Sequence, residues 1–133
     1  EATGYSSKLR EYVEKSCLKI ILFFDIPTLA NVWGAVDVAI TAGGNTLFER
    51  VASGLPGATV TQLPRQSKIA NAFQDYGVNY HIGYGPALSA GELQNELINF
   101  IKNDVNHIKQ KKMAKDMYKH PPLPIIFSEI TDN

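Results

Sequence analysis

VDVAITAGGNTLFERVASGLP, residues 36–56, is the stretch that decides the fold of this chain. An apolar strand runs into Gly43 and Gly44, and a helix follows over residues 46–53. We expect the two glycines to permit positive φ and a close backbone approach to a ligand. The N-terminus of the next helix offers free N–H groups and the positive end of the helix dipole, which together bind phosphate. The pattern therefore predicts a nucleotide-type binding site.

Apolar runs alternate with amphipathic stretches along the whole chain, as in α/β proteins. The expected strands are residues 19–24, 36–41, 58–63 and 78–83. The expected helices are residues 6–16, 28–35, 46–53, 66–76, 89–104 and 105–119. Connections of this length imply parallel crossovers, and ligands bind at the carboxyl ends of such strands. The sequence therefore predicts a doubly wound, Rossmann-like parallel sheet flanked by helices.

Four connections should meet at the carboxyl edge of this sheet, and they are residues 25–28, 42–46, 63–66 and 83–86. We expect one domain over residues 1–120 and a proline-rich, apolar tail over residues 121–133. The tail carries three prolines that prevent a helix, and its apolar side chains predict that it docks on a surface.

Composition excludes several classes of protein. The 133 residues suit a single domain, and 13 basic against 13 acidic residues give no nucleic-acid footprint. A single cysteine, Cys17, excludes an internal disulfide and suits a reducing cytosol. No apolar run approaches the ~20 residues of a membrane span. No basic n-region with an apolar core opens the sequence, so we expect no signal peptide. We expect a cytoplasmic protein. The chain does not begin with Met, so we expect a fragment or a processed product.

The central motif resembles a known family. The chain is similar to the C-terminal domain of GT-B nucleotide-sugar enzymes in three consecutive motifs and the residues that follow them. These are Asp-x-Ala-Ile, Ala-Gly-Gly-x-Thr-x-x-Glu and Gly-Leu-Pro, followed by Gln66, Asn71 and Ala72. The pattern is most similar to the UDP-sugar hydrolase of pseudaminic acid biosynthesis and its spore-coat polysaccharide relatives. The N-acetylglucosaminyltransferase of peptidoglycan synthesis is more distant. The resemblance covers roughly residues 19–104 and implies the C-terminal half of a GT-B fold.

The resemblance implies a set of substrate-binding residues. The diphosphate would lie on the loop and helix start at Gly43, Gly44, Asn45 and Thr46. Glu49 would bind the ribose hydroxyls, since a carboxylate can accept two hydrogen bonds from a vicinal diol.

Two further loops complete the implied site. The main chain near Ile26 would hold uracil, and Arg65 and Gln66 would face the sugar. Related enzymes often carry an acidic or small residue followed by Asn-Gln, whereas this chain has Pro64-Arg65-Gln66.

The opening of the chain departs from the family pattern. A complete C-terminal GT-B domain begins with a strand, a glycine turn, a helix and a second strand. Here the first helix leads almost directly into residues 19–24, so the first strands are absent from the expected sheet. We also expect that these 133 residues do not include the N-terminal lobe, which carries the catalytic histidine in the hydrolase. We therefore expect a partner lobe or self-association, with residues 121–130 or the first strand edge in the interface.

Three functions remain open. The first is the UDP-sugar-binding domain of a nucleotide-sugar hydrolase in surface polysaccharide or nonulosonic acid biosynthesis. The second is the donor-binding domain of a GT-B glycosyltransferase, which needs an acceptor. The third is a non-catalytic binding subunit that a partner completes. No triad, metal-ligand spacing or pair of carboxylates is evident, so we assign no catalytic residue, metal or cofactor. The chain alone is expected to lack turnover.

Structural interpretations of the same residues also stay open. Thr46 and Glu49 have the spacing of a capping box, in which the Thr caps the helix and the Glu reaches back. Gly43 and Gly44 could form only a tight turn. His81, near a strand end, is more often a structural histidine than a ligand.

Overall fold

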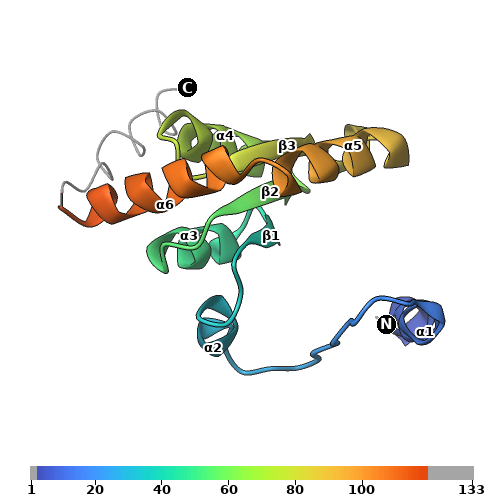
Figure 1. Cartoon of the computed structure of the whole chain (residues 1–133). Helices are drawn as coiled ribbons and strands as arrows, with labels where there is room; N and C mark the ends of the chain where they lie inside the picture. Colours follow the sequence, from blue (N-terminus) through green and yellow to red (C-terminus); the bar gives the residue numbers. More distant parts are fainter. Residues whose placement is uncertain (1–2, 120–133) are drawn as a thin grey trace.

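The computed structural model describes residues 3–119, and the proline-rich tail lies outside these residues. The strands are β1 (Ala39–Ala42), β2 (Gly57–Thr61) and β3 (Tyr80–Tyr84). The helices are α1 (Thr3–Lys15), α2 (Ala30–Trp33), α3 (Asn45–Ala52), α4 (Pro64–Asp75), α5 (Ala90–Ile101) and α6 (Asp104–Lys119), with a 3-10 turn η1 (Gly85–Ala87). Figure 1 shows the sheet between its helices, with α1 lying apart from them.

The three strands form a parallel sheet in the order β1-β2-β3. Ala39 lies opposite Gly57, and Ala58 lies opposite Tyr80. The predicted α/β class, with a Rossmann-like parallel sheet flanked by helices, is confirmed. The strand order follows the chain, as in one half of a Rossmann-like sheet. The reversal of order that a doubly wound sheet requires is not formed by residues 3–119.

Helices cover the two faces of the sheet with two separate apolar clusters. One cluster joins α3, α4 and α6 through the buried side chains of Leu47, Val51, Ala70, Ala72, Phe73 and Ala114. The other packs α5 against the opposite face, where Phe100 meets Ala58 and Ile82. Each cluster is built from apolar positions three or four residues apart on a helix, which lie on one side of it. The packing fixes the helix that follows each strand beside the sheet.

Residues 19–24 are not a strand, so the prediction of four strands was wrong. Their Ile and Phe content favours a strand, but a strand needs a neighbour to bind its backbone groups. No strand of the described chain lies beside them, and the segment runs extended between α1 and α2 (Figure 1). Ile21 and Phe23 remain 65% and 62% exposed.

The helices begin and end close to their predicted positions. The helix expected over residues 28–35 is shorter, at Ala30–Trp33. The first helix forms, yet Leu9 and Tyr12 on its apolar side are exposed. Among residues 3–119, no helix has both the length and the apolar content to cross a membrane.

Candidate functional site

Three loops meet at the carboxyl edge of the sheet, as the parallel topology requires. They are the glycine loop after β1, the turn from β2 into α4, and η1 after β3. The loop expected from residues 25–28 is not among them, because the segment before it forms no strand. Ile26 lies in the linker between α1 and α2, which extends away from the sheet in Figure 1. The structure therefore does not bring Ile26 to the other predicted site residues.

Gly43 is required by close packing within the chain. A Cβ atom at this position would lie 2.7 Å from Thr61 Cγ2 and 2.9 Å from Gln66 Cβ. The positive φ expected at the two glycines is not observed: neither is among the described residues with positive φ, and Gly44 has φ −97°. The absence of a side chain at position 43 allows the loop to pack closely against Thr61 of β2 and Gln66 of α4.

The N-terminus of α3 is open. Gly44 occupies the N-cap, and no side chain caps the helix. Leu47 donates its N–H to the Gly44 carbonyl, and within residues 3–119 the N–H groups of Asn45 and Thr46 have no acceptor. By contrast, Ser89 accepts a hydrogen bond from the Glu92 N–H at the start of α5. Helix α3 thus keeps free donors and its positive dipole end at the edge of the sheet.

Gln66 joins the glycine loop to the start of α4. Its Oε1 accepts hydrogen bonds from the backbone N–H groups of Gln62 at 2.9 Å and Leu63 at 3.2 Å. Its Nε2 lies 3.9 Å from the position of a Cβ on Gly44. Because Oε1 accepts these two hydrogen bonds, the N–H donors on Nε2 lie on the side of Gln66 that is nearer to the glycine loop.

Glu49 does not cap α3. The helix begins at Asn45, so Thr46 is inside its first turn and the expected capping box is not formed. Glu49 is exposed, and the described residues give its carboxylate no hydrogen bond or salt bridge. Arg65, in the first turn of α4, is also exposed. These two charged side chains are available to a ligand.

A polar network lies under α4, on the face of the sheet that carries threonines. His81 Nδ1 lies 2.6 Å from Asn71 Oδ1, and its Nε2 lies 3.2 Å from Thr61 Oγ1. The Thr61 hydroxyl also lies 2.6 Å from the Ser67 hydroxyl. Both ring nitrogens of His81 therefore have partners inside the fold, in agreement with a structural histidine. Thr61 is fully buried, so its hydroxyl is not placed to attack a substrate.

A second buried network centres on Arg50, which sequence reasoning missed. Its Nη1 donates to the Leu55 carbonyl at 2.9 Å, and its Nη2 donates to Asn79 Oδ1 at 2.7 Å. Asn79 Oδ1 also accepts from the Thr59 hydroxyl. Burial lowers the pKa of Arg50 to about 10, so the side chain is charged at neutral pH. Arg50 lies three residues after the core residue Leu47, and this helical spacing could have placed it inside.

The neutral state of His81 predicts a pH dependence of stability. Burial lowers the pKa of His81 below its usual 6.5, and a hydrogen bond with Gly83 partly opposes this. The unfolded chain therefore binds a proton more readily than the folded chain. The contribution of His81 to the free energy of unfolding should be fully present above about pH 6.5 and should decrease as the pH falls below it.

Urea unfolding over a pH series measures this effect. The replacement His81→Gln should flatten the slope of unfolding free energy against pH, whereas His107→Gln is the matched control. An unchanged slope in His81→Gln would show that another group causes the loss of stability.

Comparison with known proteins gives one partial match. Over 57 residues the chain is 33% identical to the spore coat polysaccharide biosynthesis protein SpsG of Bacillus subtilis strain 168. The match covers 43% of this chain and 17% of SpsG. No protein-family model matches the chain, and no solved structure matches it. Within residues 3–119, no group of three or more His, Cys, Asp or Glu side chains could hold a metal ion.

Proposed function

We propose that this chain is a UDP-sugar-binding domain of a nucleotide-sugar hydrolase in surface polysaccharide or nonulosonic acid biosynthesis. The observation that carries the proposal is the open N-terminus of α3 behind Gly43 and Gly44, at the carboxyl edge of a parallel sheet. The partial match to a spore coat polysaccharide biosynthesis protein supports a role in polysaccharide biosynthesis. We further propose that the match reflects the C-terminal half of a GT-B fold.

Each residue at the edge has a distinct part in the proposed complex. The N–H groups of Asn45 and Thr46 would donate to the diphosphate, with the Gln66 amide beside them. The free carboxylate of Glu49 would accept hydrogen bonds from the ribose diol. Arg65, next to Gln66 on α4, would face the sugar.

A second function is favoured by a separate observation. Four large apolar side chains of residues 18–24 are exposed, and so is one face of β1; the four are Leu18, Ile21, Phe23 and Phe24. If the chain is a non-catalytic binding subunit, the partner that completes it would cover these surfaces. The N-terminal lobe of a GT-B enzyme would cover them in the same way.

A donor-binding domain of a glycosyltransferase uses the same nucleotide site, and it differs from the hydrolase by requiring an acceptor for turnover.

Binding of UDP to the chain is the first test of the proposed function. Titration with UDP should shift the backbone amide resonances of the glycine loop and the first turn of α3, because these N–H groups would gain phosphate acceptors. Affinity should be low, since one domain supplies only part of a cleft. Nuclear magnetic resonance mapping measures both. Shifts confined to residues away from Gly43–Glu49 would count against the site.

The replacement Glu49→Gln tests the ribose contact. Loss of a charged hydrogen bond should weaken UDP binding by on the order of 1–3 kcal/mol, while pyrophosphate binding should be nearly unchanged. Thermal stability should also be unchanged, because Glu49 has no partner in the described chain.

Glu92 supplies the matched control for this replacement. Its carboxylate accepts hydrogen bonds from the Ser89 N–H at 2.8 Å and hydroxyl at 2.7 Å, so it is a true capping glutamate. The replacement Glu92→Gln should lower the melting temperature and leave UDP binding intact. Equal losses of UDP and pyrophosphate affinity in Glu49→Gln, together with a lower melting temperature, would refute the ribose role.

A further inference from the structure

The outer edge of β1 is unpaired. β1 pairs only with β2 among the strands of the described chain. Ala39 donates its N–H to the Pro56 carbonyl on the β2 side, and successive residues of a strand direct their backbone groups to opposite sides. Ile40 and Ala42 therefore present their N–H and C=O groups to the open edge. A row of unpaired backbone groups of this kind binds an added strand.

One face of β1 is also uncovered. Thr41 is buried, whereas Ile40 and Ala42, which point to the other side of the sheet, are exposed. Helix α5 covers this face mainly along β3, where Phe100, Leu93 and Leu97 pack. Ile40 remains 46% exposed. A parallel sheet is normally covered on both faces, so the surface beside β1 lacks an element.

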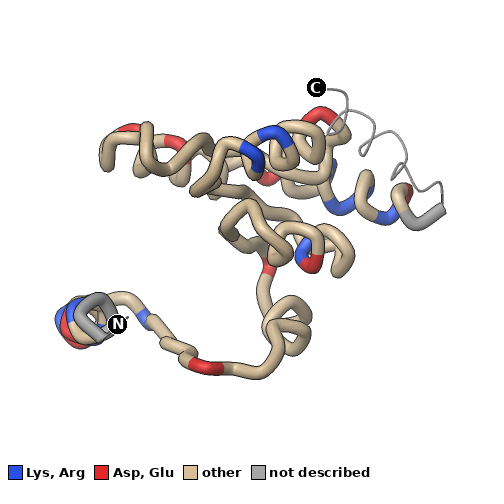
Figure 2. The backbone as a smooth tube through the Cα atoms, turned by 180° about the vertical axis from the view of Figure 1, so that it is seen from behind, with Lys and Arg blue, Asp and Glu red and all other residues tan. Residues whose placement is uncertain are grey.

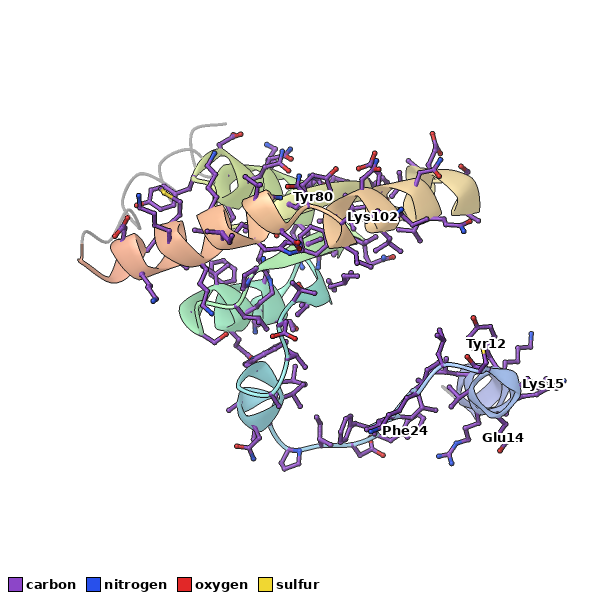
Figure 3. The ribbon with its side chains drawn as sticks, viewed as in Figure 1. Tyr12, Glu14, Lys15, Phe24, Tyr80 and Lys102 are labelled. Atoms are coloured by element: carbon purple, nitrogen blue, oxygen red, sulfur yellow. The ribbon has the colours of Figure 1, made fainter. Side chains whose placement is uncertain are left out.

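The same chain carries a segment that lacks a partner. Residues 18–24, LKIILFF, have one charge, and Figure 2 shows the linker almost free of charged residues. Their backbone runs extended, and within residues 3–119 it has no backbone–backbone hydrogen bond. Figure 3 shows Phe24 on this linker, apart from the sheet, and Arg10 of α1 lies 4.7 Å from its ring. The composition is that of a strand, and only a neighbouring strand is missing.

We propose that residues 18–24 of one copy of this chain add to the open edge of β1 in a second copy, and that the exchange is reciprocal. One chain offers both an unpaired edge and an unpaired apolar segment. A two-fold exchange between identical chains covers both surfaces with elements that the chain itself supplies, whereas a different protein would have to offer both a strand and an open edge of its own.

Local geometry favours exchange over folding back within one chain. Asp25 has a positive φ of 51°, and this left-handed residue turns the chain directly after the segment. Helix α2 then separates the segment from β1 of the same copy, and the segment leads away from that β1 in Figure 1. In domain swapping, a chain that has not yet exchanged its element holds that element away from its own fold on a linker, as residues 18–24 are held here. The proposed exchange does not depend on the proposed nucleotide site.

Sedimentation across a dilution series tests the proposal on the intact chain. The wild type should show a reversible monomer–dimer equilibrium. The replacements Phe23→Asp and Ile40→Asp should each shift it to monomer, because a charge at either side of the new strand pair cannot be buried. Ile108→Asp is the matched control, since Ile108 is 71% exposed on α6. Circular dichroism confirms that each variant is folded.

Cross-linking identifies the pairing without perturbing the apolar residues. The wild type has one cysteine, the exposed Cys17. It is mixed with a tagged variant that carries Cys17→Ser and Val36→Cys, and the mixture is mildly oxidised. We expect the added strand to run parallel to β1, as β1, β2 and β3 run parallel to one another. In that direction position 17 of one copy lies near position 36 of the other, so the mixed disulfide should exceed either self-linked product.

Three results would overturn the exchange. The first is a wild-type chain that stays monomeric at every concentration. The second is a loss of dimer in Ile108→Asp that equals the loss in Phe23→Asp. The third is an intramolecular disulfide between Cys17 and position 36 in the single replacement Val36→Cys. The last would show that residues 18–24 fold back on their own sheet.

Discussion

Replacing Arg50 with alanine should destabilise the folded chain by on the order of 3 kcal/mol. The guanidinium is fully buried and donates to the Leu55 carbonyl and to Asn79. Alanine would leave the carbonyl without this donor, weaken the Asn79–Thr59 contact and leave a cavity where the side chain packs. Relief of the desolvated charge offsets part of this cost. Chemical denaturation measures the difference in unfolding free energy.

Arg65→Ala is the matched control for this replacement. Arg65 is exposed, so its loss should change stability by no more than about 0.5 kcal/mol. Arg50→Met should cost less than Arg50→Ala, because methionine fills most of the volume. Equal stabilities of Arg50→Ala and Arg65→Ala would show that the buried network contributes little to the fold.

Replacing Gly43 with alanine should cost about 2–3 kcal/mol, the upper part of the range for overpacking a core. The new methyl group would meet Thr61 Cγ2 at 2.7 Å and Gln66 Cβ at 2.9 Å, and both belong to buried or helical positions that cannot move freely. The loop would have to lift from the sheet. UDP affinity should fall as well if the loop and the start of α3 bind the diphosphate.

Gly44→Ala provides a control one residue away. The nearest atom to an added Cβ is Gln66 Nε2 at 3.9 Å, which is ordinary contact, and φ is negative. Its stability should remain within about 0.5 kcal/mol of the wild type. Thermal melts of the two variants decide the matter. Similar melting temperatures would mean that the loop tolerates a side chain at either glycine.

The strand–loop–helix unit could be predicted because its signals are local. The apolar run before Gly43, the glycines, and the helical spacing of Leu47 and Val51 specify neighbouring elements within a few residues. The predicted strand over residues 36–41 and helix over residues 46–53 match β1 and α3 within a few positions. Periodicity indicates the type of an element even though it places the ends less precisely.

The candidate site could be predicted only in part. Parallel strands bring their carboxyl ends to one edge, so the sequence placed Gly43, Gly44 and Gln66 together correctly. The same reasoning placed Ile26 there, and it failed because it assumed that residues 19–24 form a strand. Whether an apolar run becomes a strand depends on a neighbour elsewhere in the chain or in another chain.

The sequence by itself determined the alternation of elements, the parallel sheet and the helix start that follows the double glycine. Only the tertiary structure decided that Gly43 is required by Thr61 and Gln66 and that Arg50 is buried. It also decided that Glu49 is free, because Gly44 and not Thr46 occupies the N-cap of α3. The difference is physical. Local patterns fix backbone geometry over a few residues, whereas close packing and burial depend on segments that meet only in the folded chain.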